Sequence, residues 1–173
     1  MNFREHKEIE NMESYMKLNQ QSTVAQKKCV SITISGARAL KARNHMQAVS
    51  NIAPFFFYQF YTEDDHYSHN AVGENPTFND TQTYEVLLDS KAIKYFEQNK
   101  LDVILFDDHA DIGGVSLDQQ SQENNDDMIG MASIPLDSIA TGCSMHNHFD
   151  ILSIGSNLKV GTLDVRIDVM ATT

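Results

Sequence analysis

The residues best suited to chemistry are the acidic ones in FDDHADIGGVSLDQQSQENNDDMIG, residues 106–130. An apolar run ends there in Asp107 and Asp108, and the next apolar run begins directly after Asp126 and Asp127. Carboxylate oxygens are preferred ligands of Ca²⁺, which takes roughly six to eight oxygen ligands. The stretch is therefore a candidate calcium-binding loop, but a complete site requires further carboxylates from a second loop.

Two histidine pairs are the other residues with metal-ligand chemistry. They are His66-x-x-His69 and His146-x-His148, and no cysteine or carboxylate stands at diagnostic spacing from either pair. Zinc sites in proteins need three or four such ligands. We therefore expect exposed strand or loop histidines and no metal site. The sequence also lacks a nucleophile elbow, a P-loop and a Rossmann glycine pattern, so it predicts neither a catalytic residue nor a cofactor.

Length and charge narrow the class of protein. A chain of 173 residues suits one packed domain with an appendage. Its net charge of −11 would repel nucleic acid and anionic membranes, so we expect neither as a partner. No apolar run approaches the roughly 20 residues of a membrane-spanning helix. The first residues lack a signal core, and the two cysteines have no disulfide or metal pattern, which favours a cytoplasmic protein.

Residues 1–27 differ from the rest of the chain. Their basic and acidic residues balance, so the whole net charge belongs to the remainder. Ile9, Met12 and Met16 recur at helical spacing, which predicts a short amphipathic helix. Because so short a helix is marginal alone in water, it docks on its own domain or a partner, or it remains a solvated tail. These three residues are candidate partner-binding residues.

From residue 28 to residue 170 the apolar period is two, which is typical of half-buried strands. Glycine, asparagine, aspartate and proline separate the apolar runs, and nothing suggests alternating strands and helices. One helix is expected, at residues 90–100, with Ser90 as its N-cap. The predicted strands are 29–36, 55–62, 66–72, 83–89, 101–107, 128–136, 148–154 and 159–170. The pattern predicts an all-β antiparallel sandwich.

The run FFFYQFYT, residues 55–62, is apolar on both faces of its predicted strand. One face would carry Phe55, Phe57, Gln59 and Tyr61, and the other Phe56, Tyr58 and Phe60. Either both faces belong to the sandwich core, or one is covered by the N-terminal helix or by a partner protein.

Three segments resemble elements of C2 domains. They are IAPFFFYQFY (52–61), GENPTFNDTQTYEV (73–86) and the flanks of the acidic loop, LDVILFDD and NDDMIGMASIPL. The resemblance covers residues 28–170 and implies an eight-stranded antiparallel C2-type β-sandwich. The short helical or disordered extension expected at residues 1–27 precedes it.

A narrower resemblance is to the C2 domains of the retinitis pigmentosa GTPase regulator-interacting scaffold proteins. It rests on FYQFY, the Asn-Pro-x-Phe-Asn turn, Tyr95-Phe96-x-x-Asn99-x-Leu101 and the terminal VGTLDVRIDVM. Those proteins stand at the base of cilia and hold protein partners. The resemblance implies a non-enzymatic scaffold in a cilium, axoneme or other part of the cytoskeleton.

The resemblance also implies where calcium ligands would stand, and this chain matches only part of that pattern. Asp107 and Asp127 fit two positions, whereas His109 replaces a carboxylate and Ala53 occupies another such position before Pro54. The loop 37–55 contains no Asp or Glu. We therefore expect no calcium site, with Asp107, Asp108 and Asp127 as the residual candidates.

Three cations, Arg38, Lys41 and Arg43, lie in that first loop and are candidate partner-binding residues. They either meet an anionic partner, such as a tubulin tail or a phosphoinositide, or form a charged loop with ion pairs to the acidic loop. The predicted strands at 66–72 and 83–89 carry no Lys or Arg, which argues against a phosphoinositide-binding face. We expect a calcium-independent interaction module with protein partners in a larger assembly and no small-molecule ligand. The alternative is a calcium- or phospholipid-responsive membrane-targeting domain.

Overall fold

The computed structural model describes residues 25–41, 52–108 and 128–172. Eight strands form one curled antiparallel sheet in the order β3-β2-β5-β6-β7-β8-β1-β4. Their bounds are β1 Gln26–Arg38, β2 Pro54–Gln59, β3 Asp65–Tyr67, β4 Thr77–Leu88, β5 Lys100–Asp107, β6 Met128–Pro135, β7 Met145–Leu152 and β8 Lys159–Ala171. All eight predicted strands are present, so the all-β antiparallel prediction is confirmed.

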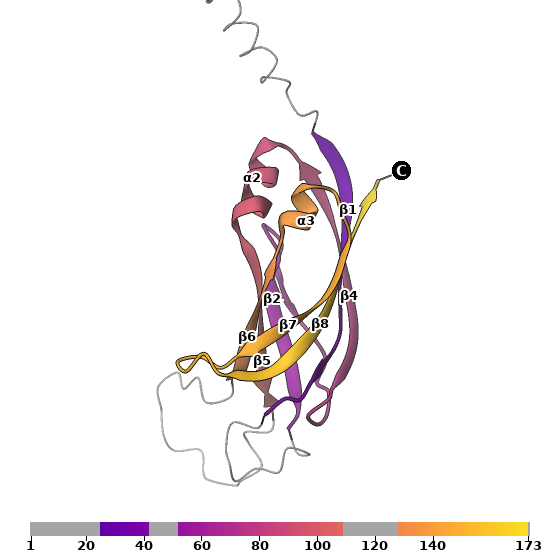
Figure 1. The fold of residues 1–173 in the computed structure, drawn as a ribbon. Helices are drawn as coiled ribbons and strands as arrows, with labels where there is room; N and C mark the ends of the chain where they lie inside the picture. The colour runs from indigo at the N-terminus through magenta and orange to yellow at the C-terminus, as the bar shows by residue number, and fades with distance from the viewer. Residues whose placement is uncertain (1–24, 42–51, 109–127, 173) are drawn as a thin grey trace, which may run out of the picture.

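The sheet folds over into two layers, with β3-β2-β5-β6 in one and β7-β8-β1-β4 in the other (Figure 1). Strands β6 and β7 join the layers through a single register pair, Met131 with Leu152. The other neighbours pair over longer stretches, and β1 with β4 and β8 forms the longest ladders. The result is a β-sandwich whose layers part between β6 and β7.

The core fills the space between the layers because alternate side chains of each strand point inward. Its fully buried members come from both layers: Val30, Ile32, Ile34, Phe56, Tyr58, Phe60, Val103, Leu105, Leu163, Val165 and Ile167. Removing an aliphatic or aromatic side chain of this size from water contributes roughly 1.5–3 kcal/mol. This burial holds the strand register, because a slip by one residue would turn each apolar set outward.

Two helices lie at the end of the sandwich where β1 begins and β8 finishes, α2 at Ser90–Gln98 and α3 at Asp137–Ala140 (Figure 1). The prediction of Ser90 as N-cap was wrong by one residue. Asp89 is the cap, and its carboxylate accepts the Ala92 N–H at 2.8 Å. Helix α3 was not predicted, because one turn gives too short a period to recognise.

The aromatic strand ends earlier than predicted. β2 stops at Gln59, and Tyr61 adopts a left-handed backbone with φ of 53°. Tyr61 therefore leaves the face of Phe55 and Phe57 and packs against Tyr95 of α2, with ring centroids 4.9 Å apart. The prediction that Tyr61 shares a strand face with Phe55 and Phe57 was wrong.

The first and last strands mark the limits of the sandwich in the sequence. β1 begins at Gln26 and β8 ends at Ala171, close to the predicted limits of the sandwich. Ile9, Met12 and Met16 lie outside the described residues, so the N-terminal helix stays a prediction. Within the described part of the chain, neither helix has the length or apolar character to cross a bilayer.

Candidate functional site

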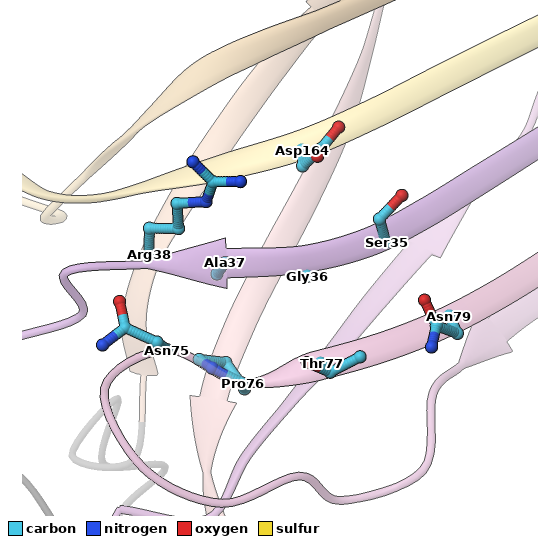
Figure 2. Close-up of a pocket in the computed structure, with 9 residues that line it drawn as sticks. All are labelled: Ser35, Gly36, Ala37, Arg38, Asn75, Pro76, Thr77, Asn79 and Asp164. Atoms are coloured by element: carbon cyan, nitrogen blue, oxygen red, sulfur yellow. The ribbon is translucent and has the colours of Figure 1, made fainter.

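A polar pocket of about 260 Å³ opens on the outer face of the β8-β1-β4 layer. Figure 2 shows Ser35 and Arg38 on β1, Thr77 and Asn79 on β4, and Asp164 on β8 around it. The side chain of Arg38 extends toward β8, whereas Asn75 lies on the opposite side of β1 (Figure 2). The pocket thus combines one guanidinium with hydroxyl and amide groups and one carboxylate, that of Asp164. The guanidinium of Arg38 is suited to bind a carboxylate or another oxyanion.

A β-bulge shapes this pocket. The register of β1 shifts between Ile34 and Gly36 against both β4 and β8. The shift brings Pro76 against the strand, where its carbonyl oxygen accepts the Ala37 N–H at 3.0 Å. A Cβ atom at Gly36 would stand 2.5 Å from that same oxygen. Glycine is required at position 36 because only a hydrogen atom fits that approach.

The turn preceding β4 closes the pocket. Asn75 Oδ1 accepts the Ala39 N–H at 3.0 Å, and the Leu40 N–H donates to the Glu74 carbonyl at 2.9 Å. Ala39 has a φ of 53°, so the chain turns sharply after Arg38 and leaves its side chain exposed. The Asn-Pro-x-Phe-Asn turn, which the sequence offered only as a mark of the fold, builds a wall of the pocket.

The charges around the pocket are unevenly paired. Asp164 accepts from the Nε2 atom of His146 at 2.7 Å, and the Nε2 atom of His148 lies 3.7 Å from its other oxygen. Among the described residues, no carboxylate forms an ion pair with Arg38 or Lys41. Arg43 lies outside the described residues. The expected ion pairs between the first loop and the acidic loop are therefore not formed by these two cations within the described chain.

The two described carboxylates at the start of the acidic loop, Asp107 and Asp108, accept hydrogen bonds from other residues of the chain. Asp107 ends β5 and its Oδ1 accepts the Ala53 N–H at 2.8 Å. The carboxylate of Asp108 accepts from the side-chain amide of Asn70, and its N–H donates to the Ala53 carbonyl at 3.1 Å. Both carboxylates tie β5 to neighbouring segments. Asp127 lies outside the described residues.

The histidines have structural partners that the sequence did not reveal. The Nε2 atom of His66 lies 2.8 Å from Asp80 Oδ1, and its ring stacks obliquely on Phe56 and Tyr58. His66 is half-buried, so its predicted exposure was wrong. In the part of the chain that the structure describes, no group of three or more His, Cys, Asp or Glu residues is placed to hold a metal ion. Cys29 and Cys143 are free thiols.

A pair of phenols lies beside this histidine within the sandwich. The Tyr84 hydroxyl donates to the Tyr58 hydroxyl at 3.1 Å. Burial raises the pKa of Tyr58, and the hydrogen bond from Tyr84 adds to that rise. Burial also raises the pKa of Tyr84. Both phenols stay protonated at neutral pH and act as hydrogen-bonding groups in the sandwich.

Comparison with known proteins identifies the fold. No family model and no curated protein matches the sequence. The first C2 domain of plant extended synaptotagmin 1 superposes with a TM-score of 0.56 at 13% identity, over 84% of this chain and 95% of that one. The chain has the fold of a C2 domain. This confirms the eight-stranded C2-type β-sandwich that the sequence segments implied.

Two further C2-containing structures resemble the chain. A C2 domain-containing protein from a putative elicitor-responsive gene has a TM-score of 0.56 at 17% identity, covering 86% of this chain and 93% of that one. CC2D1B, which acts during mitotic reformation of the nuclear envelope, has a TM-score of 0.61 at 11% identity, covering 94% and 70%. At these identities the C2 likeness is one of fold.

Proposed function

We propose that this chain is a non-enzymatic, calcium-independent C2 module that binds an acidic segment of a partner protein in the Arg38 pocket. The observation that carries the proposal is the Arg38 guanidinium, which has no carboxylate partner among the described residues and lies in a pocket lined by hydroxyl and amide groups. The one carboxylate in the lining, Asp164, already accepts from His146. A guanidinium binds a carboxylate through two parallel hydrogen bonds, and the neighbouring hydroxyl and amide groups supply further donors. Lys41, also exposed, adds positive charge three residues further on.

Calcium independence is supported by the uses that Asp107 and Asp108 already have. Each accepts a hydrogen bond from the chain, and Ala53 stands where the C2 resemblance calls for a further carboxylate. A dehydrated divalent ion would have to replace these bonds with too few oxygen ligands. The module is therefore proposed to work without calcium and without phospholipid.

The proposed setting is a scaffold in a cilium, axoneme or other microtubule-based assembly in the cytoplasm. It is supported by the likeness of the sequence motifs to ciliary scaffold C2 domains. Two of those motifs have structural roles: the Asn-Pro-x-Phe-Asn turn forms a wall of the pocket, and VGTLDVRIDVM forms most of β8. A microtubule surface presents acidic tubulin tails, which suit the Arg38 pocket.

The first test is titration of the full chain with a fluorescent oligoglutamate peptide in the presence of a chelator. We expect Arg38→Gln to weaken binding roughly ten-fold, because a hydrogen bond to a charged group contributes about 1.5–3 kcal/mol. Arg166→Gln is the matched control, since Arg166 is exposed on the same layer but donates to Asp168 at 2.8 Å. Equal loss in both variants would show only a general charge effect and would contradict the pocket.

The membrane-targeting alternative predicts different results. Calorimetric titration with calcium, with and without phosphatidylserine vesicles, should give no binding heat under the proposal. Calcium-dependent vesicle binding that Asp107→Asn abolishes would establish the alternative instead. Imaging of the tagged chain in ciliated cells tests the setting, and a location away from cilia and microtubules would refute it.

A further inference from the structure

The outer face of the β3-β2-β5-β6 layer carries an apolar row that runs straight across its four strands and ends on the adjoining strand β7. Tyr67 pairs in register with Phe57, Phe57 with Ile104, Ile104 with Met131, and Met131 with Leu152. Each residue therefore stands directly beside the next on a neighbouring strand. We name these five residues the cross-strand row.

Strand alternation directs the cross-strand row away from the core. Phe57 lies between Phe56 and Tyr58, which are 0% and 1% exposed, and Ile104 lies between two residues that are both fully buried. Successive side chains of a strand point to opposite faces, so Phe57 and Ile104 point outward. Tyr67 at one end is 60% exposed and Leu152 at the other is 39% exposed.

A second apolar line reinforces the first. Phe55 pairs with Phe106, and Phe106 pairs with Met128. The rings of Phe55 and Phe106 stack with centroids 5.3 Å apart, and those of Phe57 and Tyr67 lie 4.9 Å apart. The inner members of the two lines are half-buried, and the ends Tyr67 and Leu152 are exposed, so the outer face presents a continuous apolar band. Contiguous apolar bands on an outer face are typical of interaction surfaces.

The cross-strand row ends in a groove of about 510 Å³ where the two layers part. Met131 and Leu152 line it, together with Phe149, Ile154, Ser133 and Lys100. Ile154, in the turn beyond β7, is also largely exposed. A groove of this kind gives a bulky apolar side chain of a partner a place to anchor.

An acidic line flanks the cross-strand row on the side toward α2. Asp65, Asp102 and Asp150 each stand two residues from a row member on the same strand, so they share its outward face, about 7 Å away. Asp102 accepts from Ser133, and Asp150 pairs with Lys159 at 2.6 Å. Lys100, two residues before Asp102, is the nearby cation on β5. Three carboxylates against these two lysines leave the flank net acidic.

We infer that the cross-strand row is a second protein-binding surface, whose occupant is an amphipathic helix of a partner with lysine or arginine along one side of its apolar stripe. The carboxylates of Asp65 and Asp102 favour a partner helix whose basic side chains lie along the same side of its apolar stripe, because opposite charges then face each other. Five strands span about 19 Å, which a helix of about 13 residues matches. Four of its five members lie on the layer opposite the Arg38 pocket, and the fifth, Leu152, lies at the end of β7 and is not among the residues that line that pocket. The surface is therefore separate from the site proposed above.

The test uses two labelled helical peptides of about 14 residues. Both carry leucine at amphipathic spacing, one with lysine and the other with glutamate at the flanking positions. We expect the full chain to bind the lysine peptide, and Tyr67→Ser or Met131→Ser to weaken binding about ten-fold or more. Leu87→Ser is the matched control, because Leu87 is 55% exposed on β4 of the other layer and should leave binding unchanged.

Two further measurements test the role of the acidic flank and the independence of this surface from the Arg38 pocket. The glutamate peptide should bind about ten-fold more weakly, and Asp102→Asn should narrow the difference between the two peptides. Arg38→Gln should leave binding of the lysine peptide unchanged, which separates this surface from the Arg38 pocket. Equal affinity for both peptides would overturn the acidic flank and with it the proposed occupant.

Three results would overturn the inference outright. The first is a failure of specific binding, seen either as no saturable binding of the lysine peptide up to about 100 μM or as an equal loss of binding in Leu87→Ser. The second is a dimer in sedimentation that Tyr67→Ser dissociates, which would make a second copy the occupant. The third is a gain in peptide binding when Met12→Ser and Met16→Ser are combined, which would make the N-terminal segment of the same chain the occupant.

Discussion

The carboxylate of Asp107 accepts the backbone N–H of Ala53 across 2.8 Å, which joins the end of β5 to the residue before β2. In a calcium-binding C2 domain both positions would offer a carboxylate to the ion. Here one of the two positions is an alanine, Ala53, and the carboxylate at the other accepts that alanine's backbone N–H. The link between the strands is therefore made by a hydrogen bond within the chain.

Replacing Asp107 tests the hydrogen bond that its carboxylate accepts from the Ala53 N–H. Asp107→Asn keeps an oxygen that can accept the Ala53 N–H, whereas Asp107→Ala leaves that N–H unpaired. We expect Asp107→Ala to lower the free energy of unfolding by roughly 1 kcal/mol more than Asp107→Asn does. Urea denaturation in a chelator measures both, with Asp150→Ala as a surface control. Equal losses would show that the bond contributes nothing.

Removing one hydroxyl tests the buried phenol pair. Tyr58→Phe deprives Tyr84 of its acceptor while keeping the ring, so we expect the free energy of unfolding to fall by about 1 kcal/mol. Tyr67→Phe removes an exposed hydroxyl and should be neutral. Thermal and chemical denaturation of the two variants provide the comparison. A neutral Tyr58→Phe would show that the hydrogen bond between the two hydroxyls adds no net stability.

The raised pKa values of Tyr58 and Tyr84 predict sensitivity to alkali. Below pH 10.0, the ordinary pKa of tyrosine, both phenols are protonated in the folded and unfolded chain, so their contribution is complete. Above it the unfolded chain loses these protons and the folded chain keeps them. The free energy of unfolding should then fall by up to about 1.4 kcal/mol per pH unit for the buried Tyr58, and by less for the half-buried Tyr84. Denaturation between pH 9 and 11 measures this slope, which Tyr58→Phe should reduce.

Gly36→Ala tests the close approach that builds the Arg38 pocket. Its Cβ would meet the Pro76 carbonyl oxygen at 2.5 Å, so the turn must move away from β1. We expect a loss of about 1–3 kcal/mol in the free energy of unfolding, together with weaker binding of the oligoglutamate peptide. Ser35→Ala, the neighbouring change on the same strand, should cost far less. Unchanged stability in Gly36→Ala would contradict the described bulge.

The alternation of apolar residues predicted the strands because it indicates which face of each strand is buried in the core. Phe56, Tyr58 and Phe60 show this well, since all three are buried between the layers. The segments that resemble C2 domains predicted how the strands are connected, which the periodicity alone does not indicate. They placed Asp107 at a strand end, where the structure also has it.

Features that depend on contacts between residues distant in the sequence could not be predicted from the sequence alone. His66 meets Asp80, and the path of Tyr61 depends on α2, so neither could be read from its neighbours in the chain. The cross-strand row is of the same kind. Strand alternation indicates which residues point outward, but only the register shows that Phe57 and Ile104 stand side by side.

The cross-strand row draws one residue from each of five strands, and its members span the sequence from Phe57 to Leu152. It is a discontinuous epitope. No peptide cut from this chain would reproduce it, and an antibody raised against such a peptide would miss it. A ligand of the row would therefore report that the chain is folded, and by mass action it would stabilise the fold it recognises.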